Sequence, residues 1–219
     1  MTWEGVGNSN NFGIDRGWGT AVRRLGGMLL TALALAGCLL PRDHAPPPQA
    51  YLLEVGSYAP PAIRRSSGKT LLVTVPGTAP GFDSSRIAYT REPPKLDYYN
   101  DSVWSDTLAR MLLPILVQAF EKSGAFKAVV SPPSPVLADL RVDVEIIRLR
   151  QEFMVQPSQV RLTARLKVMD MKNGIVLDTQ VFEVLEPAPS EDAAGAARAA
   201  NAAVRRILDE MIPFALEQV

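Results

Sequence analysis

The clearest pattern in the chain is an alternation of apolar and charged side chains in two successive runs, over 140–153 and 160–169. Successive side chains of a strand point to opposite faces of a sheet. Each run therefore predicts a strand with one buried face and one charged face. Ile146-Ile147 interrupts the first alternation, and we expect a β-bulge there.

A third strand is predicted over 175–185, joined to the second by Asn173-Gly174, a dipeptide typical of type I′ turns. Shorter strands are predicted where apolar or β-branched runs lie between turn residues, over 51–58, 70–76, 87–91, 96–99 and 126–130. The two runs that flank Pro93-Pro94 would form a hairpin. The run over 70–76 is almost entirely apolar or β-branched, and we expect it to be central and buried.

Two helices are predicted from apolar residues at helical spacing. The first covers about 102–123, with Asp101 or Ser102 as N-cap, a kink at Pro114 and a stop at Gly124. Its apolar positions are Trp104, Leu108, Met111, Leu112, Ile115, Ala119 and Phe120.

The second helix is rich in alanine and is capped by Ser190-Glu191-Asp192. Its apolar face consists of Val204, Ile207, Leu208, Met211 and Ile212. Two helices packed against one mostly antiparallel sheet with a charged outer face make an α+β fold, a two-layer sandwich.

The N-terminal segment has the order of an export signal. Arg23-Arg24 precede an apolar run over 25–34, and a small-residue cleavage site follows it. The run is far shorter than the ~20 apolar residues that span a bilayer. Residues 1–37 are therefore interpreted as a signal peptide, of which 1–22 is an extension upstream of the true start.

The cleavage site reads Leu35-Ala36-Gly37-Cys38, which resembles the bacterial lipobox. In that motif the cysteine thiol carries a lipid, and the signal is cut just before it. The alternative is a buried cysteine in an apolar core segment. Leu39, where an aspartate would signal retention on the inner membrane, points to the outer membrane. A proline-rich tether over 38–50 and a single periplasmic domain over 51–219 follow.

Composition narrows the function. Lys+Arg and Asp+Glu both number 23, so no basic excess exists for binding nucleic acid. With one Cys and one His, four-ligand Cys/His zinc sites are excluded, and we expect no metal site. His44 lies in the tether, where no buried partner would orient it for catalysis. The sequence thus predicts no catalytic residue and no cofactor beyond the covalent lipid on Cys38.

The other motifs that could bind a ligand or catalyse a reaction are better explained by roles in the fold. Gly68-Lys69-Thr70 lacks the upstream glycine of a phosphate loop and opens a strand. Asp143 and Glu145 share a strand face, where cross-strand ion pairs with basic residues explain them. Those basic residues are Arg141, Arg161, Arg165 and Lys167.

Three aromatic residues, Tyr98, Tyr99 and Trp104, bracket the predicted start of the first helix. They could form part of a surface that binds a partner or lipid. The alternative is that they seal the junction between hairpin and helix, and this packing role is favoured.

In the order of several short motifs, the chain resembles one family, the auxiliary lipoproteins of ABC-type transport systems (the Pqi/Ymb-like group). The motifs are the lipobox with Cys38, Tyr51-Leu52-Leu53, Ser85-Arg86-Ile87-Ala88-Tyr89, Leu96-Asp97-Tyr98-Tyr99, Trp104-Ser105-Asp106-Thr107-Leu108, Ser123-Gly124-Ala125-Phe126 and Ala138-Asp139-Leu140. The resemblance implies a non-enzymatic subunit that accompanies MCE-domain lipid transporters of the bacterial envelope. Its implied partners are an MCE-domain protein with its ABC permease and ATPase. The lipid on Cys38 would bind the membrane, and whether copies of the chain form a homo-oligomer stays open.

Two other classes of protein stay open at the level of sequence. One is a lipoprotein cofactor of cell-wall synthesis or outer-membrane assembly, for which a charged groove would be expected. The other is an envelope hydrolase that uses only carboxylates, drawn from Asp139, Asp143 and Glu145.

Overall fold

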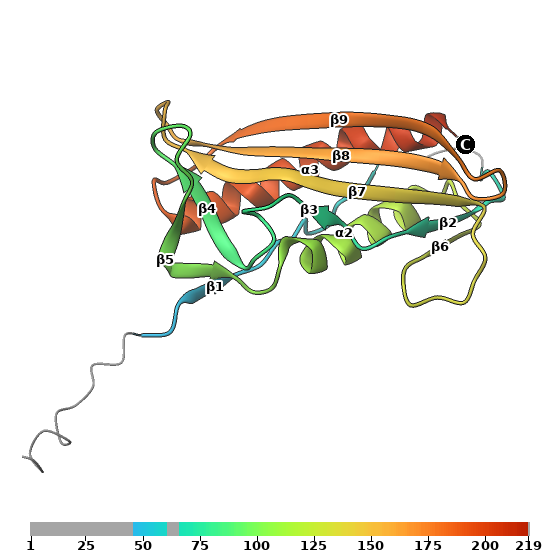
Figure 1. The fold of residues 1–219 in the computed structure, drawn as a ribbon, viewed down its shortest axis with the longest axis horizontal. Coiled ribbons are helices and arrows are strands. Elements are labelled where there is room, and N and C mark those ends of the chain that lie inside the picture. Colours follow the sequence, from blue (N-terminus) through green and yellow to red (C-terminus); the bar gives the residue numbers. More distant parts are fainter. Residues whose placement is uncertain (1–45, 61–65, 219) are drawn as a thin grey trace, which may run out of the picture. The chain divides into compact units, whose positions relative to one another are not determined.

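The computed structural model describes residues 46–60 and 66–218 (Figure 1). The predicted signal peptide, the lipobox with Cys38, and His44 lie outside the described residues. The elements are β1 (Gln49–Tyr51), β2 (Thr70–Val73), β3 (Gly77–Thr78), β4 (Arg86–Thr90), β5 (Asp97–Trp104), α2 (Leu108–Lys122), β6 (Ala128–Val130), β7 (Leu140–Glu152), β8 (Gln159–Asp170), β9 (Ile175–Pro187) and α3 (Ala193–Glu217).

Strand β7 organises the sheet because it pairs along both of its edges. One edge carries β8 in a long antiparallel ladder, and β9 continues the sheet antiparallel to β8. The other edge carries β2, β3 and β4 in turn, each parallel to a short stretch of β7. Strands β5 and β1 extend the sheet beyond β4, and β6 extends it beyond β2. The predicted α+β class is thus confirmed, with the longest ladders and the β4–β5 pair antiparallel and the other short pairings parallel.

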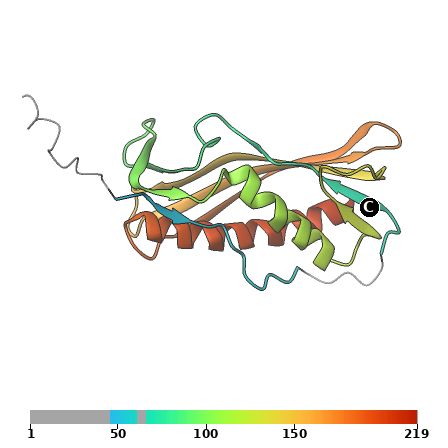
Figure 2. The same ribbon diagram turned by 90° about the horizontal axis from the view of Figure 1, so that it is seen from below.

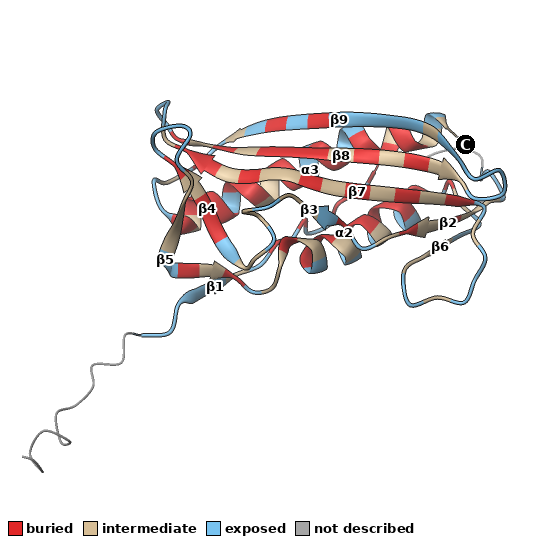
Figure 3. Ribbon diagram, viewed as in Figure 1, coloured by how far each residue is buried: buried red, intermediate tan, exposed pale blue. Residues whose placement is uncertain are grey.

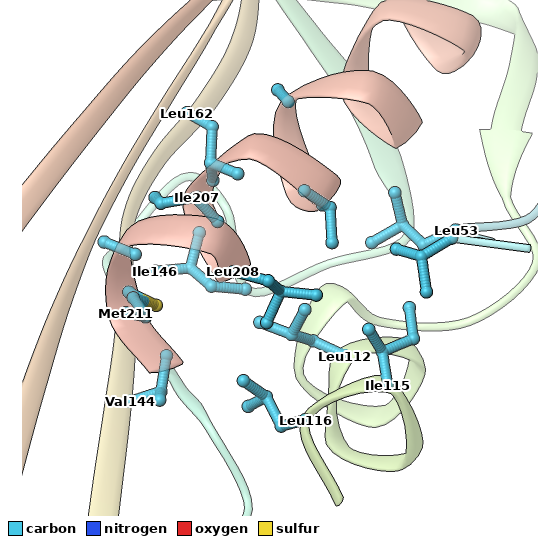
Figure 4. Close-up of a cluster of buried hydrophobic side chains, with 14 of the residues drawn as sticks. Leu53, Leu112, Ile115, Leu116, Val144, Ile146, Leu162, Ile207, Leu208 and Met211 are labelled. Carbon is cyan, nitrogen blue, oxygen red and sulfur yellow. The ribbon is translucent and has the colours of Figure 1, made fainter. Parts of the chain in front are cut away.

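Both helices cover the same face of the sheet (Figure 2). Buried and partly exposed residues alternate along β7 and β8 (Figure 3). The buried set belongs to the core that the two helices share with the sheet. The predicted apolar face of α3 is confirmed: Val204, Ile207, Leu208, Met211 and Ile212 are all buried. Figure 4 shows side chains of α2, α3 and the sheet meeting in this core.

The predicted start of the first helix is wrong by about two turns. Strand β5 continues through Trp104, and α2 begins at Leu108 after the N-cap Thr107. The Trp104 amide donates to the Ser85 carbonyl, so this residue belongs to the sheet although its side chain fits the helical spacing. Asp106 precedes the helix and pairs with Arg110. The predicted stop is confirmed, since Gly124 follows the C-cap with a φ of 67°.

The predicted strand over 51–58 is also wrong beyond Tyr51. Its alternation is real, because Leu53, Val55 and Tyr58 are buried. The backbone, however, bonds to side chains of the helices: Asn201 accepts from the Glu54 amide at 2.7 Å, and its own amide donates to the Leu52 carbonyl. Leu53 inserts between α2 and α3 (Figure 4). In this segment, the alternation of apolar residues reflects packing against the helices and not pairing with another strand.

The predictions for the long strands hold in most details. The register of β7 and β8 shifts between Ile146 and Arg148, which confirms the bulge. The hairpin of β8 and β9 is confirmed, but its turn has four residues and not two, because Asp170 pairs with Ile175. The Asp170 carboxylate stabilises this longer loop by accepting from the amides of Lys172 and Asn173.

Candidate interaction surface

The sheet face opposite the helices, which we call the outer face, carries ordered charges. Arg141 pairs with Asp143 at 2.7 Å along β7, and Arg165 of β8 pairs with Glu145 across the ladder. The predicted cross-strand ion pairing is thus confirmed for Glu145, whereas Asp143 pairs within its own strand. Exposed pairs of this kind contribute little stability, typically below about 1 kcal/mol. These ion pairs therefore contribute little to the stability of the fold. Their main effect is to make the outer face a polar surface of mixed charge.

One ion pair on this face is buried. The Glu152 side chain, 2% exposed, accepts from Arg150 and from two nitrogens of Arg161, which also pairs with Glu183 at 2.5 Å. Burial alone would raise the pKa of the Glu152 carboxyl, but the hydrogen bonds from Arg161 and Arg150 outweigh it, so the pKa lies below its ordinary value. This carboxylate is ionised and fully engaged at neutral pH.

A shallow hollow of about 360 Å³ lies on the outer face beside β3. The residues that line it come from β2, β3, β7 and β8 and the links between them: Thr74, Val75, Gly77, Thr78, Arg141, Asp143, Val144, Glu145, Arg165 and Lys167. Thr74 donates to the Asp143 carboxylate at 2.7 Å, so the acidic side chains of the hollow already have partners. The hollow is open, polar and mixed in charge, which suits contact with a polar protein surface.

Strand β9 is the most exposed element of the sheet. Within the described residues it pairs with β8 alone, so no strand covers its other edge, although the Leu185 carbonyl accepts from Arg206 of α3. Val181 and Leu185 project from its outer face and are 50% and 38% exposed. A long edge strand with apolar side chains is a ready template for pairing with another chain. The outer face and this edge together form the candidate interaction surface.

The structure gives the three predicted aromatic residues packing contacts. Trp104 is 3% exposed and lies in the core. The Tyr98 hydroxyl donates to the Gly81 carbonyl at 2.9 Å, and the Arg86 guanidinium stacks on its ring. Tyr99 donates to the side chain of Gln151 at 2.6 Å, and burial raises its pKa to about 12. They do not bracket the helix start, since all three belong to β5.

The carboxylates proposed for hydrolysis are not brought together as an unpaired acid pair. Asp139 accepts from the Thr70 amide at 2.8 Å, while Asp143 and Glu145 are occupied by arginines. The described residues hold no group of three or more Cys, His, Asp or Glu side chains placed to bind a metal. In the same part of the chain, no helix combines the length and apolarity that crossing a bilayer requires.

Sequence reasoning missed the buried polar cluster at one end of the sheet. Gln151 and Glu152 are each 1% exposed, and Gln151 donates to Ser158 and to the Ser190 carbonyl. After the bulge, the inward positions of β7 change parity, so a glutamine follows the buried leucine at the next inward position. The signal that could have revealed this cluster is the pair Gln151-Glu152, two adjacent polar residues at the end of a strand whose inward positions are otherwise apolar.

Comparison with known proteins identifies the kind of molecule. The fold defines an α+β domain with helices on one sheet face and an ion-paired face open to solvent. Residues 51–212 match the family described as the ABC-type transport auxiliary lipoprotein component. The chain therefore belongs to that family, which confirms the resemblance of its motifs.

Solved structures support the fold. A protein from Xanthomonas campestris aligns with a TM-score of 0.70 at 24% identity, covering 78% of this chain and 95% of that one. A second structure, of an uncharacterized protein, aligns with a TM-score of 0.61 at 10% identity, covering 77% and 99%. No curated protein sequence matches the chain.

Proposed function

We propose that this protein is a lipid-anchored, non-catalytic auxiliary subunit of an ABC-type transport system that moves lipid across the bacterial envelope. The observation that carries the proposal is the family match over residues 51–212. In the finer form of the proposal, the system is of the MCE type. The lipid on Cys38 holds the domain at the periplasmic face of the outer membrane.

The non-catalytic role is supported by what the polar side chains do. Among the described residues, Asp143 and Glu145 beside the hollow pair with arginines and Asp139 accepts from a backbone amide, which supports a role for them in structure and contact rather than as a general base. We propose that the protein needs no cofactor besides its covalent lipid. It would contribute position and contact, while the ATPase supplies energy.

The proposed partner is an MCE-domain protein, together with its permease and ATPase. The candidate interaction surface supports a polar contact: mixed charges along β7 and β8, flanked by the exposed backbone edge of β9. Backbone pairing at an edge gives affinity, and the charged side chains beside it give register and specificity. The same edge could join copies of this chain, and self-assembly is part of the proposal.

Affinity purification tests the proposal. The protein carries a C-terminal tag, is extracted from gently solubilised membranes, and its partners are identified by mass spectrometry. We expect an MCE-domain protein with its permease and ATPase. Recovery of cell-wall synthases or outer-membrane assembly proteins instead would favour the alternative class, a cofactor of those processes.

Two variants control this purification. Cys38→Ala removes the lipidated thiol and should lose the membrane-dependent partners. Val181→Glu places a charge on the outer face of β9, where the side chain is 50% exposed and lies opposite Arg165, so the fold should tolerate it. If the partners depend on the candidate interaction surface, the Val181→Glu protein stays anchored but recovers less of them.

A further inference from the structure

The loop between β7 and β8, residues 153–158, exposes apolar side chains at its tip. Met154 and Val155 are 45% and 47% exposed, and Phe153 beside them is half-buried. Connections between strands are normally polar, so adjacent exposed apolar residues at such a tip call for an explanation. We call residues 153–155 the apolar tip.

The loop that carries the apolar tip is held at both ends. The Phe153 amide donates to the Thr90 carbonyl at 3.0 Å, and the Arg91 guanidinium lies 4.1 Å from the centre of the Phe153 ring. At the other end of the loop, the Ser158 amide donates to the Glu191 carboxylate at 2.9 Å. Because only four residues lie between these two fixed ends, fewer conformations of Met154 and Val155 have to be given up on binding.

The apolar tip lies at the end of the domain where the chain arrives from the predicted anchor. Gln49, the first residue of β1, shares a hollow with Tyr99. The Tyr99 ring contacts Tyr89 with centroids 4.8 Å apart, and Tyr89 contacts Phe153 at 5.8 Å. A continuous row of aromatic rings thus connects the start of the domain to the apolar tip.

The length of the tether keeps this end close to the bilayer. Ten residues lie between Cys38 and Gln49, and a fully extended chain of that length spans at most about 40 Å. A lipid on Cys38 would hold the start of β1 within this distance of the membrane. Because the tether keeps the domain at a high effective concentration near the membrane surface, even a weak apolar contact with the lipid would be formed for much of the time.

We propose that the apolar tip inserts into the lipid surface to which the protein is anchored and fixes the orientation of the domain. Met154 and Val155 would enter the boundary of the acyl chains. Arg91, exposed at the base of the tip, would lie at the level of the lipid phosphates, where a guanidinium can form paired hydrogen bonds. Lys95 nearby pairs with Asp97 at 3.2 Å, and Glu92 offsets the charge of Arg91, so this end has no basic excess and apolar insertion drives the contact.

This inference uses the lipid anchor of the proposed function but not its transport partners. The sequence holds one cysteine, whose thiol the lipid would occupy, so an introduced cysteine is the single site for a label. We would attach an environment-sensitive fluorophore to Met154→Cys in the full lipidated protein. The protein is reconstituted into vesicles of phosphatidylethanolamine and phosphatidylglycerol that contain nitroxide-labelled lipid as quencher.

Leu137→Cys is the matched control. This residue is also apolar, is 95% exposed, and precedes β7 at its opposite end. We expect strong quenching at position 154 and little at 137. Adding Val155→Asp should reduce the quenching at 154 to the level of 137, whereas Gln156→Asp, at an exposed polar neighbour, should leave it unchanged.

Several outcomes would overturn the inference. No quenching at 154 means that the apolar tip does not contact lipid, and quenching at 154 no stronger than at 137 means that the tip does not fix the orientation of the domain. Protection of the label only after partner proteins are added would assign the apolar tip to a protein interface. Uptake of the fluorophore by the unsubstituted protein would show that the Cys38 thiol is free and remove the anchor on which the inference rests.

Discussion

At the scale of single residues, Glu152 is the charge whose pairing matters most to the fold. Its carboxylate is almost fully buried and joins Arg150 of its own strand to Arg161 of the neighbouring one. Removing one partner from a buried ion pair leaves the others uncompensated, which costs far more than breaking a surface pair. The outer face therefore contains one structural charge among several solvated ones.

Replacing Glu152 tests this difference. Glu152→Gln should lower the free energy of unfolding by about 3 kcal/mol, because two guanidinium groups lose their common carboxylate. Glu145→Gln, on the same strand but with its side chain 43% exposed, should cost less than about 1 kcal/mol. Urea denaturation of the two variants measures both values. Equal losses would show that burial does not distinguish the two pairs.

The same residue predicts a dependence of stability on pH. The pKa of Glu152 in the fold lies below its ordinary value of 4.5, so its ionised form is favoured by folding. Its contribution is complete above the pKa of the unfolded chain and is lost as the pH falls through the lower pKa of the folded state. Between about pH 5 and about pH 3, the wild type should therefore lose more stability than Glu152→Gln. Parallel acid-denaturation curves would contradict this.

At the scale of elements, the first turn of α3 requires a residue without a side chain at Gly195, although the surrounding sequence is rich in alanine. The Asp192 carboxylate caps the helix by accepting from the Gly195 amide at 2.7 Å. This brings the chain so close that a Cβ on Gly195 would lie 2.0 Å from the Ser190 carbonyl oxygen. The predicted cap is therefore confirmed, and the glycine three residues later is what lets it form.

Gly195→Ala should destabilise the protein although alanine is the best helix former. Relieving the clash requires moving the cap or the backbone of Ser190, and we expect a loss of about 2 kcal/mol or more. Gly124→Ala is the control: its φ of 67° is strained for alanine, but nothing lies near the added Cβ, so about 1 kcal/mol is expected. Thermal unfolding of both variants gives the comparison. A stabilised Gly195→Ala protein would show that the helix start adapts freely.

The element scale also shows where sequence patterns stop predicting structure. Strands β7 and β8 follow from alternation, since each shows one buried face over many residues, and β9 follows from the turn signal Asn173-Gly174 before it. Residues around Leu53 alternate in the same way, yet Asn201, far away in the chain, supplies their hydrogen bonds. Trp104 fits a helical spacing by coincidence, because its partner Ser85 is likewise remote. A local pattern therefore predicts which side chains are buried. It does not predict which distant segment supplies their hydrogen-bond partners.

At the scale of the whole molecule, the candidate surfaces differ in how far sequence could predict them. Alternation predicts most charges of the outer face, including Asp143, Glu145 and Arg165, but not Glu152, which follows the bulge in β7. The hollow beside β3 was not predicted, because it needs β2, β3, β7 and β8 to converge. The apolar tip was missed because its two exposed side chains resemble the end of an apolar strand.

Together these features suggest an arrangement for the protein in the envelope. The end with the apolar tip and the start of β1 would face the membrane, and the outer face with the edge of β9 would meet the transport partner. Both contacts can form at once, because the tip joins the ends of β7 and β8 whereas Val181 lies midway along β9.

Site-specific photo-crosslinking in living cells tests the central claim most directly. A photoreactive residue replaces Val181 on the outer face of β9, and Leu137, in the loop before β7, serves as the control position. The account predicts a crosslink from position 181 to an MCE-domain protein of an ABC transport system and none from 137. A crosslink from 181 to cell-wall or assembly proteins, or no crosslink while the protein is anchored and folded, would contradict it.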